Sequence, residues 1–216
     1  MINNIRRIVI FGAGALGHEI AEYACDTYGW STESTDKILF IDDTPGLTSF
    51  NKSWEVIHTF SNYKYVEGDK FLIGLGCSFD RRKIYDVVRD KNYELAILIH
   101  PTSYVSKYAK LSPGVIVAPH CTIGAMASIS DNVMLNTYSA VGHHVKIGHS
   151  CVLSPKVLLA GASSLGDNVF VGSCAFVTPQ IIIGNRCRIM AGAGVYRDCI
   201  DDSLISGNPA KSYKLK

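Results

Sequence analysis

Three of the seven histidines lie within seven residues of one another, at His143, His144 and His149. Histidine accepts and returns protons readily near neutral pH, so this cluster is the first candidate for general-base chemistry. From composition alone the competing interpretation is three solvated surface residues. The choice between them depends on how the surrounding chain places each ring.

The histidines lie inside a six-residue repeat. Stepping six residues at a time from Val105 to Val195, all sixteen positions hold Leu, Ile or Val. This period fits neither a helix nor an alternating strand. It is typical of a hexapeptide β-helix, in which three units close a triangular coil of eighteen residues and the aliphatic side chain points inward. The repeat predicts about five stacked coils.

Glycine or alanine follows the aliphatic residue in many units, as a tight corner would require. The glycines are Gly124, Gly142, Gly148, Gly166, Gly172 and Gly184. The fourth residue after the aliphatic one is again small or apolar, which predicts a second inward position. Cys121, Cys151 and Cys187 fall there and are expected to pack in the core.

Repeat position separates the histidines. His143 is the second residue after Val141, so it is expected on an outward corner, and Gly161 follows one coil later at roughly 5 Å. A base beside a bare peptide N–H is what acyl transfer from a thioester requires. His149 occupies the next corner and therefore faces a different side of the coil.

The N-terminal residues predict a small βαβ unit. A strand over 7–11 leads into the G-x-G-x-x-G run of Gly12, Gly14 and Gly17, then a helix from His18 to about Tyr28. A second strand over 37–41 ends at Asp42 and Asp43. This layout suits a phosphate at a helix N-terminus. Glycines used only for close strand–helix packing are the alternative.

Two further strands, over 71–75 and 95–99, are expected to complete a four-stranded sheet. Such a sheet lacks the second half that would hold a nicotinamide, so one nucleotide-sized ligand fits better than NAD. Gly76 and Arg81 offer a second place for an anionic ligand, with a solvated helix face as the alternative for the arginine. Residues 44–65 show no period and are expected to form an irregular loop.

Length and composition allow one large or two small domains of ordinary globular type. A net charge of +2 predicts neither a nucleic-acid nor a membrane surface, and no apolar run reaches the length of a membrane span. The first seventeen residues could be mistaken for a signal peptide, but the short apolar run 8–11 favours a first strand. Seven cysteines without paired spacing suit the cytoplasm. Their spacing relative to the histidines predicts no metal site.

Near the C-terminus, Gly207-Asn208-Pro209-Ala210-Lys211 resembles the G-x-P-A-[KR] signature of hexapeptide acyltransferases, where it lies near coenzyme A. The repeat itself resembles the left-handed parallel β-helix of that family. The resemblance implies a homotrimer of side-by-side chains, with acetyl-CoA between adjacent β-helices. Pro209 and Lys211 are the implied cofactor-binding residues of the motif.

The N-T-x-x-x-V-x-H segment that ends at His143, together with the N-terminal unit, closely resembles bacterial nucleotide-sugar acetyltransferases and the related sialic acid O-acetyltransferases. The resemblance covers essentially the whole chain. It implies His143 as general base and Gly161, Ala191 and Gly192 as acetyl-CoA contacts. It also implies that the glycine loop, Asp42 and Asp43 hold the nucleotide sugar.

Two positions depart from the family pattern. Relatives follow the base with Glu or Asp, which orients the imidazole, whereas this chain has His144. Several relatives carry His where this chain has Leu16, and the neighbouring His18 is a candidate to replace it. The resemblance therefore implies that another protein group, water or a backbone carbonyl orients His143.

The prediction is a Rossmann-like nucleotide-sugar-binding domain over residues 1–100, followed by a left-handed β-helix that binds acetyl-CoA over residues 101–216. The resemblance implies a cytoplasmic N-acetyltransferase of a dTDP- or UDP-linked 4-amino-4,6-dideoxyhexose, serving O-antigen, lipopolysaccharide or other surface-glycan synthesis. A sugar O-acetyltransferase is one alternative. A non-catalytic trimeric scaffold that binds nucleotide sugars is the other.

Overall fold

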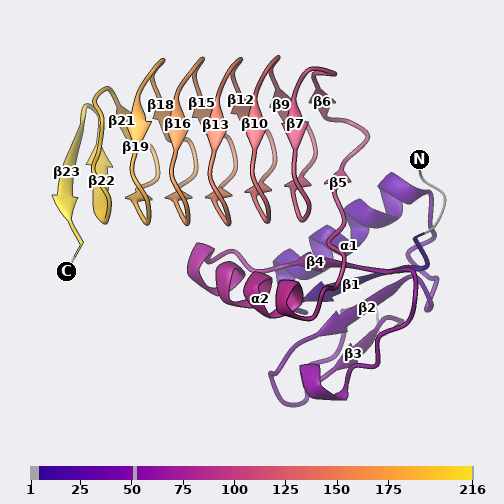
Figure 1. Ribbon diagram of the computed structural model, residues 1–216. Helices are drawn as coiled ribbons and strands as arrows, with labels where there is room; N and C mark the ends of the chain where they lie inside the picture. The colour runs from indigo at the N-terminus through magenta and orange to yellow at the C-terminus, as the bar shows by residue number, and fades with distance from the viewer. Residues whose placement is uncertain (1–4, 51–52, 216) are drawn as a thin grey trace.

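The computed structural model describes residues 5–50 and 53–215, which form a small α/β domain followed by a long β-solenoid (Figure 1). This is the predicted fold class. Residues 1–4 of the predicted N-terminal domain and of the segment considered as a signal peptide lie outside the described residues. The same holds for residues 51–52 of the predicted loop. No helix in the described ranges is long and apolar enough to cross a bilayer.

The N-terminal sheet has four parallel strands in the order β3-β2-β1-β4. Their bounds are β1 Arg7–Phe11, β2 Ile38–Ile41, β3 Glu55–Ile57 and β4 Asp69–Ile73. Alternate residues of β1 face opposite sides. Ile8 and Ile10 pack toward α1 (Ala15–Tyr28), whereas Val9 and Phe11 pack in the cluster that includes residues of α2 (Ser78–Asp90).

One loop prediction and one strand prediction were wrong. Part of the predicted loop 44–65 forms β3 and a short 3₁₀ helix, Phe60–Asn62, because Val56 and Ile57 are apolar enough to extend the sheet. The expected strand 95–99 does not join this sheet beyond a single bridge from Leu95 to Phe71. Its end forms β5 (Leu98–Ile99), which pairs with the solenoid. The reason is visible in the repeat, since Ile99 precedes Val105 by six residues.

The solenoid has three parallel faces, each built from every third strand. The five-stranded face contains β7 Lys110–Leu111, β10 Ser128–Ile129, β13 Lys146–Ile147, β16 Ser164–Leu165 and β19 Ile182–Ile183. The six-stranded face contains β6 Tyr104–Val105, β9 Thr122–Ile123, β12 Ala140–Val141, β15 Leu158–Leu159, β18 Phe176–Val177 and β21 Gly194–Val195.

The eight-stranded face begins with β5 and ends in an antiparallel hairpin. Its other strands are β8 Ile116–Val117, β11 Met134–Leu135, β14 Val152–Leu153, β17 Phe170–Val171, β20 Arg188–Ile189, β22 Ser203–Gly207 and β23 Ala210–Lys214. The second residue of each two-residue strand from β8 to β21 is buried inside the coil, as the repeat predicted. Cys121, Cys151 and Cys187 are buried with them.

The glycines after the aliphatic residues have a different purpose from the one predicted. None of these six has a positive φ; instead, every sixth residue from His120 to Arg186 does, at φ between 56° and 67°, and all twelve are non-glycine. A Cβ at Gly142 would lie 2.8 Å from the backbone nitrogen of Gly161 in the next coil. Glycine is therefore required for the close stacking of coils, and the left-handed turn lies two residues later.

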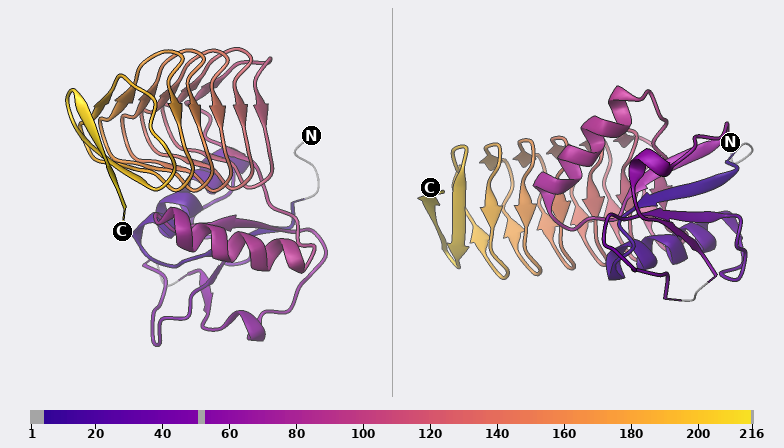
Figure 2. Two further views of the ribbon diagram at one scale, coloured as in Figure 1. Left: turned by 60° about the vertical axis from the view of Figure 1, so that its left-hand side comes forward. Right: turned by 90° about the horizontal axis from the view of Figure 1, so that it is seen from below.

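The N-terminal domain packs against the outer side of the eight-stranded face (Figures 1 and 2). Ile116, Met134 and Val152 point outward from that face and share one apolar cluster with Ile20 and Ala24 of α1. Burial of several aliphatic side chains, each contributing about 2 kcal/mol, holds the two parts together. For the described residues, the edge of the solenoid opposite this face stays clear of the N-terminal domain (Figures 1 and 2).

Candidate active site

His143 and Gly161 occupy one edge of the solenoid, between the six-stranded and five-stranded faces. The imidazole lies over the glycine: a Cβ at residue 161 would lie 2.6 Å from Nε2 and 2.7 Å from Cε1 of His143. The Gly161 N–H donates no hydrogen bond within the described part of the chain, while its carbonyl accepts from the N–H of Gln180. The structure thus brings the predicted base and the predicted peptide donor together.

His144 contacts the base directly. Its Nδ1 lies 3.1 Å from Nδ1 of His143, and the two rings meet edge to face with centroids 5.3 Å apart. Both side chains are exposed. His149 lies on a different edge, with its Nδ1 3.5 Å from a carboxylate oxygen of Asp131. His144, and not His149, is therefore the imidazole that can influence His143.

The same edge continues to a cavity of about 510 Å³ at the C-terminal end of the solenoid. Its lining consists of Tyr196, Arg197, Pro209, Ala210 and Lys211. The Asn208–Pro209 bond is cis, and the Tyr196 hydroxyl donates to Oδ1 of Asn208 at 3.2 Å. Two cations beside an aromatic ring can hold the phosphate and base of a nucleotide.

Arg197 was missed by the sequence analysis, although the repeat contains the signal. It follows His143 by 54 residues, which is three coils, and therefore belongs to the same edge. The strand spacing puts the two corners roughly 14 Å apart along the stack. The edge thus links a basic cavity at one end to the imidazole and the Gly161 N–H at the other.

Ala191 and Gly192, the other predicted cofactor contacts, lie on a different edge of the solenoid from His143. They follow β20 and precede β21, at the edge between the eight-stranded and six-stranded faces. One chain does not bring them together with His143 and Gly161.

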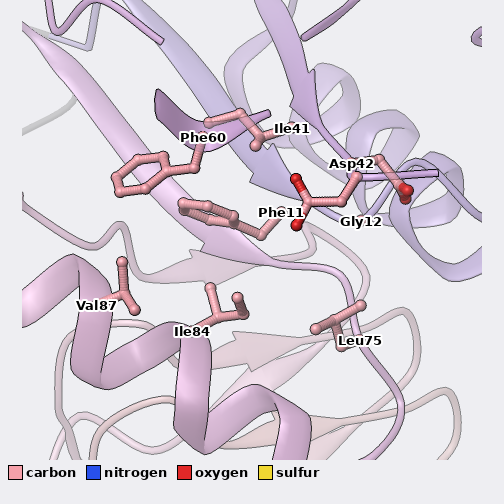
Figure 3. Close-up of a pocket in the computed structure, with 9 residues that line it drawn as sticks. Phe11, Gly12, Ile41, Asp42, Phe60, Leu75, Ile84 and Val87 are labelled. Atoms are coloured by element: carbon pink, nitrogen blue, oxygen red, sulfur yellow. The ribbon is translucent and has the colours of Figure 1, made fainter. Parts of the chain in front are cut away.

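A second cavity, of about 320 Å³, opens at the carboxyl ends of β1, β2 and β4 (Figure 3). Predicted residues in it are Gly12, Asp42 and Asp43. The remaining lining residues, which the sequence analysis did not assign to a site, are Phe11, Ile41, Phe60, Leu75, Ile84 and Val87. An apolar slot with carboxylates at its rim suits a nucleoside, whose flat base can lie against the Phe60 ring while its hydroxyls meet the acids.

The two carboxylates differ. Asp42 accepts hydrogen bonds from the N–H groups of Ala13 at 2.8 Å and Thr44 at 2.9 Å. Partial burial favours the neutral acid, but these bonds outweigh it and hold the pKa of Asp42 below its ordinary value. Asp42 therefore orders the glycine loop, whereas the exposed Asp43 is the freer acceptor for a ligand.

In the glycine loop, Gly12 and Gly17 are needed for close packing, whereas Gly14 stands at the uncapped N-terminus of α1. Gly12 has φ of +99°, and a Cβ there would lie 2.9 Å from Leu75, while a Cβ at Gly17 would clash with the Gly12 carbonyl. A Cβ at Gly14, the N-cap of α1, would meet nothing within 4 Å, and no side chain caps the helix. Gly76 is also exposed. Gly14 and the first N–H groups of α1 are available to an anion.

Two predicted ligand contacts were wrong. Arg81 is fully buried and donates to the carbonyls of Ile73 and Leu75 and to Asn132, with Nη2 2.9 Å from Oδ1 of that side chain. Burial lowers the pKa of Arg81 to about 9. It fastens α2 and the end of β4 to the solenoid, so it cannot bind a phosphate. Sequence spacing alone does not separate a buried arginine from a solvated one.

His18 is the second case. It is 5% exposed, and its ring stacks on Phe50 with centroids 3.9 Å apart. Nε2 accepts from the N–H of Phe50 at 2.9 Å, and Nδ1 lies 3.0 Å from the carbonyl of Gly14. Both ring nitrogens are occupied by the protein, so no donor is left for a phosphate. His18 supports the glycine loop from behind.

Comparisons with known proteins match both parts of the chain. The model of the PglD N-terminal domain matches residues 7–88. The acetyltransferase domain of PglB from Neisseria gonorrhoeae FA1090 shares 28% sequence identity, over 96% of this chain and 100% of its own, with a TM-score of 0.87. It has also been solved in complex with acetyl coenzyme A.

PerB from Caulobacter crescentus, solved in complex with CoA and GDP-perosamine, shares 28% identity over 97% of this chain and 98% of its own, with a TM-score of 0.84. WeeI from Acinetobacter baumannii AYE, at 19% identity and a TM-score of 0.72, shares the fold. The likeness spans both the α/β domain and the solenoid. Residues 7–88 thus match the PglD N-terminal domain, and the whole chain is similar to nucleotide-sugar acetyltransferases of the hexapeptide type.

Proposed function

We propose that this protein transfers an acetyl group from acetyl-CoA to the 4-amino group of a nucleotide-linked 4-amino-4,6-dideoxyhexose, for surface-glycan synthesis. The observation that carries the proposal is the position of His143 Nε2 over Gly161, whose N–H has no partner within the described residues. The perosamine N-acetyltransferase among its structural relatives was solved with a nucleotide amino sugar, which supports a 4-amino sugar as the acceptor.

In the proposed reaction, the amine nitrogen attacks the thioester carbonyl carbon, and the carbonyl electron pair moves onto oxygen. The Gly161 N–H stabilises this oxyanion, while Nε2 of His143 takes the proton that leaves the nitrogen. As the carbonyl reforms, the C–S bond breaks and the protonated His143 returns its proton to the thiolate of coenzyme A. The products are an amide and a free thiol, and no other reactant is required.

Acetyl-CoA would extend along the His143 edge. The thioester would lie at His143 and Gly161, the pantetheine arm would follow the edge past Pro179, and the phosphoadenosine would enter the cavity of Arg197 and Lys211. Charge-assisted hydrogen bonds from both cations would fix its phosphates. The nucleotide sugar would occupy the cavity beside Asp43 and Phe60.

Within one chain these two cavities do not form a single site, because the N-terminal domain packs on the eight-stranded face and His143 lies on the opposite edge. We therefore infer a homotrimer whose active sites lie between subunits. The outward row of the six-stranded face is uncharged: Tyr104, Thr122, Ala140, Leu158, Phe176 and Gly194. Contact through this face would bring the edge of Ala191 and Gly192 beside the His143 edge of a neighbour.

Turnover with a panel of nucleotide-linked 4-amino sugars, followed by release of free CoA thiol, tests the proposal. The expected result is rapid turnover with at least one of them, reduced roughly 10²–10⁴-fold in His143→Ala. His149→Ala, which removes a histidine from another edge, should retain wild-type turnover. Faster turnover of a hydroxyl acceptor such as sialic acid would favour the O-acetyltransferase alternative.

Binding of CoA without acceleration by any sugar would favour the non-catalytic scaffold. We also place the protein in the cytoplasm, where acetyl-CoA and nucleotide sugars are made. All seven cysteines are free thiols, which suits that reducing compartment.

A further inference from the structure

The contact between Nδ1 of His143 and Nδ1 of His144, at 3.1 Å, requires one shared proton. If both nitrogens carried hydrogen they would repel, and if neither did no hydrogen bond would form. With the proton on His143, its Nε2 is a free lone pair beside Gly161. With the proton on His144, Nε2 of His143 carries hydrogen and cannot accept a proton from the amine.

The backbone holds this pair in place from both sides. The N–H of His144 donates to the carbonyl of Ala125 in the preceding coil at 3.0 Å. The carbonyl of His143 accepts from the N–H of Ala162 in the next coil at 2.8 Å. His144 has φ of +58°, and the equivalent residues Met126 and Ala162 have φ of 61° and 59°. The coil therefore dictates the backbone conformation, whatever side chain stands at this position.

We propose that His144 is a positioning residue: in its neutral form, its Nδ1 accepts the Nδ1–H of His143 and so keeps Nε2 of His143 available as the base. This inference rests on the proposed acetyl transfer. It answers how the chain orients its base at a position where the family resemblance implies a carboxylate. The ring of His144 takes over the orienting function but brings no negative charge.

The missing charge has a functional consequence. A carboxylate partner would stabilise protonated His143 electrostatically, whereas a neutral imidazole stabilises it through the hydrogen bond alone. Protonation of His144 would remove the acceptor lone pair and break the pair. The equivalent corners of the two neighbouring coils flank the histidine pair. They consist of Ala125 and Met126 in the preceding coil and Gly161 and Ala162 in the next, and none of these residues is titratable. The nearest charged residue along the chain is Lys146.

Variants at position 144 test the inference, because the neighbouring coils prove that alanine and methionine fit this backbone conformation. His144→Ala and His144→Met remove the acceptor and should lower kcat about 10- to 100-fold with an unchanged KM for acetyl-CoA. His144→Asn keeps an acceptor oxygen in a residue that tolerates a positive φ and should recover most of the activity. His144→Glu should move the acidic limb of the pH–rate profile to higher pH.

Nitrogen-15 NMR of the imidazoles provides a readout that does not depend on turnover. In the expected spectrum of the 216-residue chain, Nδ1 of His143 and Nε2 of His144 carry hydrogen. In His144→Ala, hydrogen no longer resides on Nδ1 of His143 alone. A His143 ring protonated on Nε2, or equal kcat in His144→Ala and wild type, would overturn the inference. If the spectrum is as expected but no amino sugar is acetylated, the proposed function fails and the histidine pairing stands.

Discussion

The ring of His143 covers Gly161 so closely that a methyl group on the glycine would lie 2.6 Å from Nε2. Gly161→Ala should therefore displace the imidazole and lower kcat about tenfold or more, with little change in melting temperature, because an exposed side chain can move aside. Gly148→Ala is the matched control. Its methyl would meet the Gly166 backbone at 2.6 Å instead, so it should lower the free energy of unfolding by about 1–3 kcal/mol. Equal effects of the two variants on kcat per folded molecule would contradict the assignment.

Arg197 should determine the affinity for the phosphorylated end of coenzyme A. Arg197→Ala removes one of the two cations of the C-terminal cavity, so KM for acetyl-CoA should rise about 10- to 100-fold, with kcat maintained at saturation. Lys214→Ala, on β23 outside that cavity, serves as the control. Acetyl-dephospho-CoA provides a second check, because the variant should no longer distinguish it from acetyl-CoA. A variant that keeps full discrimination would place the phosphate elsewhere.

Leu158 should lie in the proposed subunit interface. It is 46% exposed in the single chain and stands in the uncharged row of the six-stranded face. Light scattering of the wild type should give a mass three times the 23.6 kDa of one chain. Leu158→Lys would bury a charge and should yield inactive monomers. Ile182→Lys changes a more exposed aliphatic residue, 58% exposed, on the five-stranded face, and should leave the protein trimeric and active. A monomeric wild type with full activity would refute the shared site.

Asp69 should make the N-terminal domain sensitive to acid. It is fully buried and accepts hydrogen bonds from Arg7 and from the Tyr63 hydroxyl. Burial favours the neutral acid, but these partners outweigh it and hold the pKa of Asp69 below its ordinary value. Because the folded pKa is the lower one, the stabilisation is present above about pH 4 and is lost as pH falls through the folded value.

Asp69→Asn should therefore destabilise the protein by about 3 kcal/mol at pH 7 and by less at pH 3. Denaturant unfolding at both pH values measures the difference. Asp80→Asn, which changes an exposed acid on α2, should have little effect at either pH. A stability gap that is independent of pH would exclude ionised Asp69 as the cause.

The sequence predicted the solenoid well because every stacked coil must turn an aliphatic side chain inward at the same positions. The requirement therefore returns every six residues and is visible in the sequence. The same repeat placed His143 and Gly161 on one edge. It also contained two signals that the sequence analysis did not use, since Ile99 and Arg197 both obey the register. The glycine after each aliphatic residue was given the wrong reason, because a single coil cannot reveal how closely the next coil approaches.

The N-terminal site was harder to predict. Gly12, Asp42 and Asp43 line the same cavity, as expected. Phe60 and Ile84 also line it, but they come from separate elements and belong to no sequence motif that would have identified them. Arg81 and His18 were taken for ligand contacts because their types suit phosphate. Whether such a side chain points outward depends on neighbours far away in the sequence, such as Asn132 and Phe50.

The hairpin of β22 and β23 also affects how the eight-stranded face of the solenoid ends. A stack of parallel coils presents unpaired N–H and C=O groups at its last strand, which is a template for adding the next coil from another chain. Here β23 runs antiparallel to β22, with Ser203 opposite Lys214, and exposes Lys211 and Lys214 along the final edge. Reversed direction and positive charge both discourage end-to-end polymerisation. Removing the hairpin should expose this edge and increase end-to-end association of the molecules.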